Sequence, residues 1–229
     1  MKKEIEIKYS VATEDALRSL ERSACQIFPN SKLTEAHQTN FFFDTKDLDV
    51  RRRGYGLRLR QENEEFVFTI KGPSQQKKGD TTATVTQRLE FECSLDKNRA
   101  RLLLTGIDDP LAIVENLDVL DEQMRRTRSH LVAAIKTVCF GKKMTLLGSF
   151  KNLRTTLPVI VNGSEMKLEF DRIQFDEAPI QFEVELEIRS MEMLAVAETF
   201  LLDLFSSCSQ VPTYEKSKSE RFYAFLSHY

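Results

Sequence analysis

The chain has 229 residues, of which 41% are hydrophobic and 30% are charged, an ordinary composition for a globular protein that buries a core. Its 33 lysines and arginines nearly balance 35 aspartates and glutamates, giving a net charge of -2, which argues against a general nucleic-acid binder, whose domain should be clearly basic. No apolar run is long enough to cross a membrane, and the charged N-terminus lacks the apolar core of a signal peptide. We therefore expect a cytoplasmic protein, monomeric or homodimeric, with no nucleic-acid or membrane partner.

The cysteines and histidines point to neither disulfides nor zinc. The four cysteines are scattered without CxxC spacing, and none of the three histidines follows them at the spacing of a zinc finger. In a chain of this length we expect free, reduced thiols.

The first element in the chain is a predicted strand with one charged face. Polar and apolar residues alternate strictly in Glu4-Ile5-Glu6-Ile7-Lys8. Side chains alternate between the two faces of a strand, so the two carboxylates and the ammonium share one face while the isoleucines enter an apolar layer.

A helix is predicted next, followed by three strands. Thr13 is a suitable N-cap, and apolar residues recur at helical spacing from Leu17 to Ile27, before Pro29-Asn30 ends the helix. Residues 36–44 read as a strand, and residues 57–61 and 66–71 read as a hairpin. Arg58 and Arg60 share one face of the first strand of that hairpin, and Thr69 and Lys71 share one face of the second.

The rest of the chain repeats the same kinds of pattern. Residues 72–84 form a polar loop, residues 86–92 form a strand, and residues 96–140 are helical, with Pro110 at the first position of a helix. Strands are predicted at 146–157, 159–162, 167–171 and 182–188, with a turn at Asn162-Gly163. An amphipathic helix at 191–206 and a short final helix close the chain. We find no linker and expect a single domain over residues 1–229.

The charged strand faces have two interpretations: a solvated sheet face or a functional site. An antiparallel sheet with one solvated face also alternates apolar and polar residues. Here, however, like charges occur in pairs and triplets, as in Glu183, Glu185 and Glu187. Like charges about 4 Å apart repel by about 1 kcal/mol in water and about 4 kcal/mol at an effective dielectric near 20. Because surface exposure offers no gain for such an arrangement, we favour a functional face.

An enclosed acidic cluster needs cations, and these come from two sources. Carboxylates without histidine or cysteine suit Mg²⁺ or Mn²⁺. The cations Arg58, Arg60, Lys71, Arg154 and Lys167 suit an oxyanion with several charges. Acids and bases on the inner face of one curved sheet imply a metal-bridged polyphosphate. About eight strands can be counted, enough to close an antiparallel barrel around one small ligand; the predicted class is α+β, with helices packed around the barrel.

These residues resemble the CYTH family, also called triphosphate tunnel metalloenzymes. The N-terminal Glu4-Ile5-Glu6-Ile7-Lys8 is similar to the family's ExExK signature, which alone is a weak signal. The ordered set after it is more specific and covers nearly the whole chain. That set comprises Phe42-Phe43-Asp44-Thr45, Leu57-Arg58-Leu59-Arg60, Thr69-Ile70-Lys71, Arg88-x-Glu90-x-Glu92, Arg154, Asp171, Glu183 to Glu187, and Lys216-Ser217-Lys218.

The resemblance implies a closed eight-stranded antiparallel barrel whose polar tunnel binds a triphosphate, and it implies a role for each matching residue. The triphosphate-binding set is Lys8, Arg58, Arg60, Lys71, Arg154, Lys167, Lys216 and Lys218. The metal-binding set is Glu4, Glu6, Glu90, Glu92, Asp171, Glu183, Glu185 and Glu187. Glu183, Glu185 and Lys8 are the expected catalytic residues. The acidic strand offers three glutamates where the motif needs two, Lys216 and Lys218 compete for one role, and Arg154 is favoured over Lys151.

The expected activity is divalent-metal-dependent hydrolysis of inorganic, thiamine or nucleoside triphosphate. One metal bridges the phosphates, while a second metal or a glutamate of the 183–187 strand orients or deprotonates the attacking water. The alternative within the family is an adenylate cyclase, which forms cyclic AMP and pyrophosphate from ATP. A third reading is a module that binds polyphosphate or nucleotide without turnover.

Overall fold

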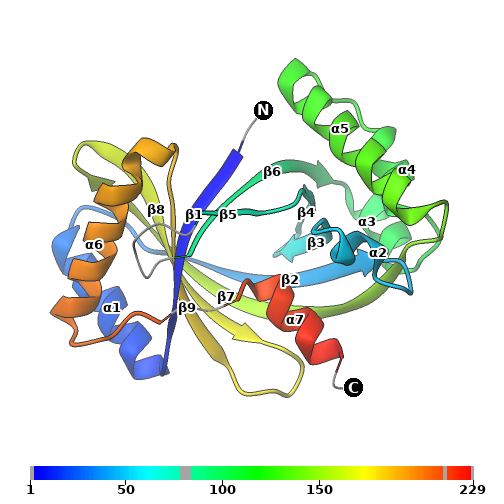
Figure 1. Ribbon diagram of the computed structural model, residues 1–229. Helices are drawn as coiled ribbons and strands as arrows, with labels where there is room; N and C mark the ends of the chain where they lie inside the picture. The colour runs from blue at the N-terminus through cyan, green and yellow to red at the C-terminus, as the bar shows by residue number, and fades with distance from the viewer. Residues whose placement is uncertain (1–2, 78–83, 214–215, 228–229) are drawn as a thin grey trace. The chain divides into compact units, whose positions relative to one another are not determined.

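The computed structural model describes residues 3–77, 84–213 and 216–227, with side chains over the same ranges except residues 3–4, 75–77 and 84–86. The strands are β1 (Lys3–Val11), β2 (Thr34–Asp44), β3 (Gly56–Glu62), β4 (Glu65–Lys71), β5 (Gln75–Lys77), β6 (Thr84–Leu95), β7 (Thr145–Val161), β8 (Ser164–Gln174) and β9 (Gln181–Glu187). The helices are α1 (Glu14–Ile27), α2 (Asp49–Arg52), α3 (Lys97–Leu104), α4 (Pro110–Glu115), α5 (Glu122–Cys139), α6 (Leu194–Ser207) and α7 (Lys218–Leu226), with a 3₁₀ turn at Met191–Met193. Figure 1 labels these elements along the chain.

The strands form one sheet that closes on itself. They are hydrogen-bonded in the order β1-β9-β8-β7-β2-β3-β4-β6-β5, and β1 also pairs with β6. Eight strands complete this ring, and β5, which lies in the segment predicted as a loop, is added beside β6. The six strand pairs with a defined register are all antiparallel. The predicted α+β class with a closed eight-stranded barrel is therefore confirmed.

The chain is organised as two units. Unit 1 comprises residues 1–3, 38–75 and 88–149, and unit 2 comprises residues 4–37, 76–87 and 150–229. Strands β1, β2, β5, β6 and β7 have residues in both. The expectation of a single domain over residues 1–229 stays a prediction.

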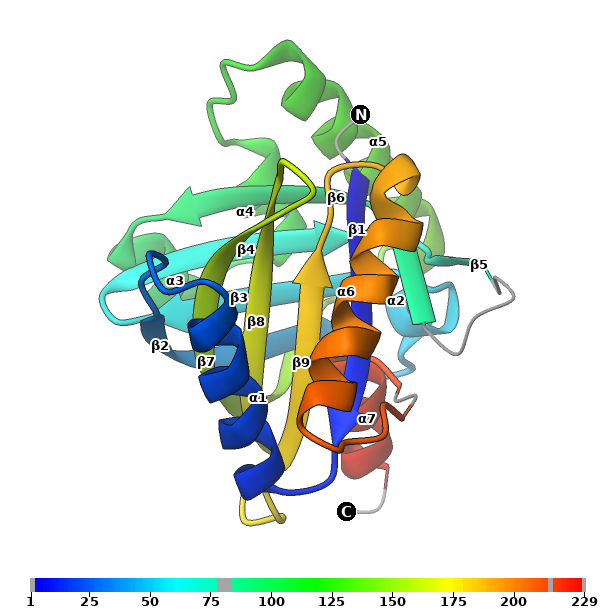
Figure 2. The same cartoon turned by 90° about the vertical axis from the view of Figure 1, so that its left-hand side faces the viewer.

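Unit 2 buries its core between the sheet and two helices. Helix α1 begins as predicted, with the Thr13 side chain accepting a hydrogen bond from the backbone N–H of Ala16, and it buries Leu17, Leu20 and Ala24. The apolar faces of β1, β8 and β9 join α1 and α6 in one buried cluster. Figure 2 shows α1 and α6 side by side over these strands. The isoleucines of the first strand therefore enter an apolar layer, which leaves the alternate face of β1 for charged residues.

One strand boundary was predicted wrongly. The pattern placed a break at Pro158, but β7 is continuous, and its pairing with β8 runs from Lys151 to Val161 with Pro158 opposite Lys167. Proline lacks one donor, yet its fixed φ is compatible with an extended strand, so the ladder continues on both sides of it. The turn at Asn162-Gly163 is confirmed: both residues have positive φ, 48° and 77°, as a tight hairpin turn requires.

Unit 1 packs its helices against the other part of the sheet. Helix α4 begins as predicted, since the Asp109 side chain caps it and Pro110 stands at its first position. Residues of α3, α4 and α5 share a buried cluster with Phe43, Phe68 and Phe91 of the strands. The helical prediction for this segment is confirmed.

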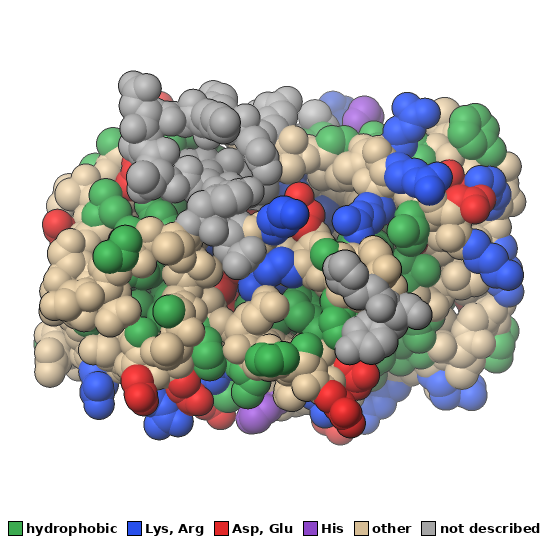
Figure 3. Space-filling model, turned by 60° about the horizontal axis from the view of Figure 1, so that its bottom comes forward, with side chains coloured by type: hydrophobic (Ala, Val, Ile, Leu, Met, Phe, Trp, Pro, Cys, Tyr) green, Lys and Arg blue, Asp and Glu red, His purple; other side chains and the backbone are tan. Residues whose placement is uncertain are grey.

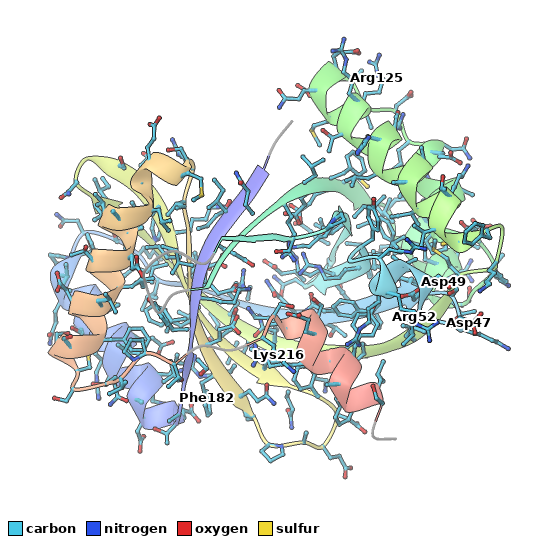
Figure 4. All side chains as sticks on the ribbon, in the orientation of Figure 1. Asp47, Asp49, Arg52, Arg125, Phe182 and Lys216 are labelled. Carbon is cyan, nitrogen blue, oxygen red and sulfur yellow. The ribbon has the colours of Figure 1, made fainter. Side chains whose placement is uncertain are left out.

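A buried carboxylate organises the entry to α2. The Asp44 side chain is fully buried and accepts hydrogen bonds from the backbone N–H groups of Thr45, Val50 and Arg51. Nearby, Lys142 Nζ donates to Asp47 at 2.7 Å and to Asp49 at 2.9 Å; Figure 4 labels both aspartates beside α2. Asp44 belongs to the matched Phe-Phe-Asp-Thr segment, and its contacts give it a structural role.

The surface and the cysteines agree with the composition. Acidic and basic side chains lie next to one another on the face drawn in Figure 3. All four cysteines are free thiols, as predicted. Among the helices of the described residues, none is long and apolar enough to cross a membrane.

Candidate active site

The register of unit 2 gathers charged residues from β1, β7, β8 and β9 on one face of the sheet. Lys8 stands opposite Glu185, and Asp171 stands opposite both Glu183 and Arg154. Because directly opposite residues in an antiparallel pair point to the same face, residues up to 177 positions apart become neighbours.

Glu185 and Asp171 are the centre of this face. Lys8 Nζ lies 3.1 Å from Glu185 Oε1 and 2.7 Å from Glu6 Oε1. The Arg154 guanidinium donates from Nε to Asp171 Oδ1 at 2.8 Å and from Nη2 to Asp171 Oδ2 at 2.6 Å. The same Nη2 is 2.8 Å from Glu185 Oε2. The pairing of Arg154 with Asp171 is therefore bidentate, the strongest arrangement of an arginine and a carboxylate.

Helix α7 adds two more cations. Lys218 Nζ is 2.8 Å from Asp171 Oδ2 and 2.8 Å from Glu185 Oε1, and it also contacts Glu183. Arg221 donates to Glu183 and, at 2.7 Å, to Gln181 Oε1. Lys218 thus contacts three of the acids directly, whereas Lys216, labelled in Figure 4, is exposed on the segment before the helix.

We call this set the unit 2 cluster. It contains five carboxylates (Glu6, Glu169, Asp171, Glu183, Glu185) and four cations (Lys8, Arg154, Lys218, Arg221), joined by ion pairs. Asp171, Glu183 and Glu185 are buried, and each offers an oxygen within 4.8 Å of those of the other two. An oxygen-only donor set of this kind fits a hard divalent cation such as Mg²⁺ or Mn²⁺.

Burial and neighbouring charges separate the pKa values of these acids. Burial opposes ionisation of Asp171, but the charges of Arg154 and Lys218 outweigh it and lower its pKa to about 2. The pKa of Glu185 is likewise held well below its usual range by Lys218, Lys8 and Arg154, against the effect of burial. Burial dominates for Glu183 and raises its pKa to about 7, although Lys218 and Arg221 contact it. The site thus combines permanent carboxylates with a group that exchanges a proton near neutral pH.

Glu169 gives a testable pH dependence. Burial raises its pKa to about 7, although it contacts Arg154. The folded state then binds more protons than the unfolded state between about pH 4.5 and 7, so Glu169 makes the protein less stable as pH rises through that window. Glutamine at position 169 does not titrate, so Glu169→Gln should lack this loss. As pH rises from about 4.5 to about 7, the unfolding free energy of E169Q should increase relative to that of the native protein by up to about 3 kcal/mol. Urea unfolding of both proteins across that range measures it; a pH-independent difference would contradict the raised pKa.

Unit 1 holds a second mixed set on β3, β4 and β6. Arg58 Nη2 donates to Thr69 Oγ1 at 3.3 Å and lies 3.7 Å from Glu92 Oε1. Lys71 Nζ is 3.3 Å from Glu90 Oε1. Arg60 Nε lies 3.9 Å from Glu62 Oε2, a loose ion pair. We call Arg58, Arg60, Lys71, Glu90 and Glu92 the unit 1 set.

Besides the exposed Lys216, three expected site residues lie apart from these groups or outside the described side chains. Lys167 and Glu187 pair with each other at 3.7 Å, and their side chains are 63% and 44% exposed. The side chain of Glu4 lies outside the described residues.

Three residues that contact the site were missed from the sequence. Glu169 shares the face of Lys167 and Asp171, so strand alternation alone could have identified it. Asn152 donates to Asp171 Oδ1 at 2.8 Å and lies two residues before Arg154 on β7, so alternation could have found it as well. Arg221 stands one helical turn after Lys218, a spacing that places both on one face of a helix.

Comparisons with known proteins identify the family and the fold. The CYTH domain matches residues 2–223. Among solved structures, an adenylyl cyclase-like protein from Hippeastrum, described as having a dominant triphosphatase activity, is 22% identical with a TM-score of 0.74, covering 97% of this chain and 96% of that one. A Bacillus halodurans protein described as an adenylate cyclase candidate is 20% identical, with a TM-score of 0.59 and coverage of 97% and 100%. The Mimivirus capping enzyme triphosphatase is 12% identical, with a TM-score of 0.54 and coverage of 91% and 90%. No curated protein matches the chain.

Proposed function

The chain belongs to the CYTH family, and we propose that it is a divalent-metal-dependent triphosphatase that hydrolyses a terminal phosphoanhydride bond. The observation that carries the proposal is the buried group of Asp171, Glu183 and Glu185, held among the cations Lys8, Arg154 and Lys218. Triphosphatase activity is also named for the Hippeastrum and Mimivirus proteins of the same fold.

The acids of the unit 2 cluster are assigned to the metal. Asp171, Glu183 and Glu185 would hold a Mg²⁺ or Mn²⁺ ion. Glu6 is linked to this group by Lys8, whose ammonium contacts both Glu6 and Glu185. When bound, the metal would neutralise phosphate charge and orient the substrate. Of the three glutamates of β9, the proposal takes Glu183 and Glu185 and leaves out Glu187, which pairs with the exposed Lys167.

The cations are assigned to the phosphates. Arg58 lies 3.7 Å from Glu92 and Arg60 lies 3.9 Å from Glu62. A guanidinium group has five N–H donors in a fixed planar arrangement, which suits several phosphate oxygens. Lys71 of the unit 1 set carries positive charge of the kind that phosphate oxygens bind, and so do Lys8 and Arg154 of the unit 2 cluster. Phosphoryl transfer depends mainly on positioning and electrostatics, which such cations supply.

Glu183 is assigned to the attacking water. It is fully buried, it contacts two cations of α7, and its pKa is raised to about 7 by burial. With a metal bound beside it, the Glu183 carboxylate would be ionised, and it could orient the attacking water by accepting a hydrogen bond from it. In this assignment Arg221, which donates to Glu183, fixes the orientation of the carboxylate.

A substrate panel tests the proposal. Purified protein is incubated with inorganic triphosphate, thiamine triphosphate or ATP, each with Mg²⁺ or Mn²⁺, and phosphate release is measured. Metal-dependent phosphate release from at least one substrate is expected. Cyclic AMP and pyrophosphate from ATP would instead identify a cyclase, and triphosphate binding without turnover would identify a binding module; either result rejects the triphosphatase proposal.

Arg58 gives a prediction for substrate binding. Replacing Arg58 by alanine should raise the KM for triphosphate by about ten- to a hundredfold, because hydrogen bonds to charged groups contribute about 1.5–3 kcal/mol. The matched control is Arg53→Ala, which removes an exposed arginine that has no carboxylate partner among the described residues. Steady-state kinetics of both variants measure the KM for triphosphate. An unchanged KM in R58A would show that Arg58 does not bind the substrate.

A further inference from the structure

The ammonium group of Lys218 lies inside the group of carboxylates assigned to the metal. Its Nζ is 2.8 Å from Asp171 Oδ2 and 2.8 Å from Glu185 Oε1, and it contacts Glu183 Oε1. These are the three residues whose oxygens lie within 4.8 Å of one another. A lysine ammonium has three N–H donors, so one donor is available for each carboxylate.

The position of Lys218 is fixed by its helix. Lys218 is the first residue of α7, and Ser217 caps that helix in a reciprocal capping box with Glu220. Three residues later, Arg221 is tied to Glu183 and Gln181 of β9. Phe222 packs against Phe150 and Phe175, with ring centroids 5.6 and 6.1 Å away. The cap, the arginine and the aromatic contacts together hold the ammonium at the acids.

We propose that Lys218 is a built-in cation that competes with the divalent metal for Asp171, Glu183 and Glu185. A metal ion that bound these three carboxylates would occupy the space in which the ammonium lies, and the two positive charges would repel each other at that separation. Metal therefore binds this group by exchange: the ammonium leaves as the ion enters, and Lys218 sets the affinity of the site. The inference rests on the proposed function only in its use of a divalent metal.

Direct metal binding tests the exchange without substrate. Mn²⁺ is titrated into the native protein and into Lys218→Met, which keeps a long side chain and removes the charge, and free Mn²⁺ is followed by electron paramagnetic resonance. K218M should bind Mn²⁺ at least about tenfold more tightly, because a competing state lowers apparent affinity by the fraction of protein that it occupies. Lys151→Met, which removes an exposed lysine of β7, should leave the affinity unchanged. Equal or weaker Mn²⁺ binding by folded K218M overturns the proposal.

Chemical labelling of the native protein tests the same exchange without any substitution. Lysines are acylated with a water-soluble ester, and modification of each residue is followed by mass spectrometry with and without Mg²⁺. Labelling of Lys218 should be slow without metal and faster at saturating Mg²⁺, while labelling of Lys151 stays constant. Protection of Lys218 that is unaffected by bound metal overturns the proposal.

Turnover measured on the same samples separates this inference from the proposed function. Hydrolysis by the native protein together with unchanged Mn²⁺ affinity in K218M rejects the exchange and keeps the triphosphatase. Tighter Mn²⁺ binding by K218M without hydrolysis of any triphosphate by the native protein rejects the triphosphatase and keeps the exchange.

Discussion

Glutamine in place of Glu185 should reduce kcat for triphosphate hydrolysis by at least about a hundredfold, the range seen when one preorganised electrostatic group is removed from an active site. Glu185 is buried and contacts Lys8, Arg154 and Lys218. Glutamine keeps its size but removes its charge, so it weakens the metal group and leaves three cations with one carboxylate fewer. Phosphate release at saturating Mg²⁺ and substrate measures the loss, and circular dichroism confirms that the variant is folded.

Glu187→Gln is the matched control for this result. Glu187 lies two residues further along β9 on the same face, but its side chain is 44% exposed and pairs with Lys167. Loss of such a surface ion pair changes little, so E187Q should retain most of the activity. Equal losses in E185Q and E187Q would mean that the acidic strand acts as a whole, and full activity in E185Q would remove Glu185 from the site.

The faces of the strands could be predicted from the sequence because alternation is a local property. Ile5 and Ile7 are buried in the apolar layer, while Glu6 and Lys8 lie on the opposite face with the other charged residues. A period of two positions fixes which residues share a face of each strand, and the count of strands was sufficient for a closed sheet. The local signals at Thr13, Pro110 and Asn162-Gly163 were equally informative, since caps and turns depend on neighbouring residues.

The partners of each charge could not be predicted in this way because they depend on register and on helix docking. Nothing within the two strands indicates that Lys8 stands opposite Glu185 and not opposite Glu183 or Glu187. The choice between Lys216 and Lys218 depended on where α7 begins, which the Ser217 cap decides. Lys167 was expected to bind phosphate from its strand face, but it lies at the exposed end of that face.

The unit 2 cluster is therefore a site in which the chain's own cations largely balance its acids. Five carboxylates face four cations, and two of those carboxylates, Glu169 and Glu183, have pKa values raised to about 7. When a charge in this cluster is added or removed, Glu169 and Glu183 can therefore respond by gaining or losing a proton near neutral pH. This balance makes the stability of the fold sensitive to each cation.

Arg154 should show that sensitivity most directly. Its guanidinium is tied to Asp171 and Glu185 by hydrogen bonds of 2.6 to 2.8 Å and also contacts Glu169. Arg154→Met keeps much of the side-chain volume but removes the cation that contacts all three of these carboxylates, and it leaves Lys218 as the shared cation of Asp171 and Glu185. Removal of one partner from a buried ion pair costs about 3–5 kcal/mol, so the unfolding free energy of R154M at pH 7.5 should fall by that amount in urea.

The pH dependence of R154M distinguishes lost charge from lost packing. Without the arginine, the carboxylates hold protons more tightly in the folded state than in the unfolded state, so stability falls as pH rises above about 4. The deficit of R154M relative to the native protein should therefore be smaller at pH 5 than at pH 7.5. Lys151→Met, which removes an exposed cation three residues away on β7, should change stability by no more than about 0.5 kcal/mol at either pH. A deficit of equal size at both pH values would assign the effect to packing and would reject Arg154 as the cation that holds these acids together.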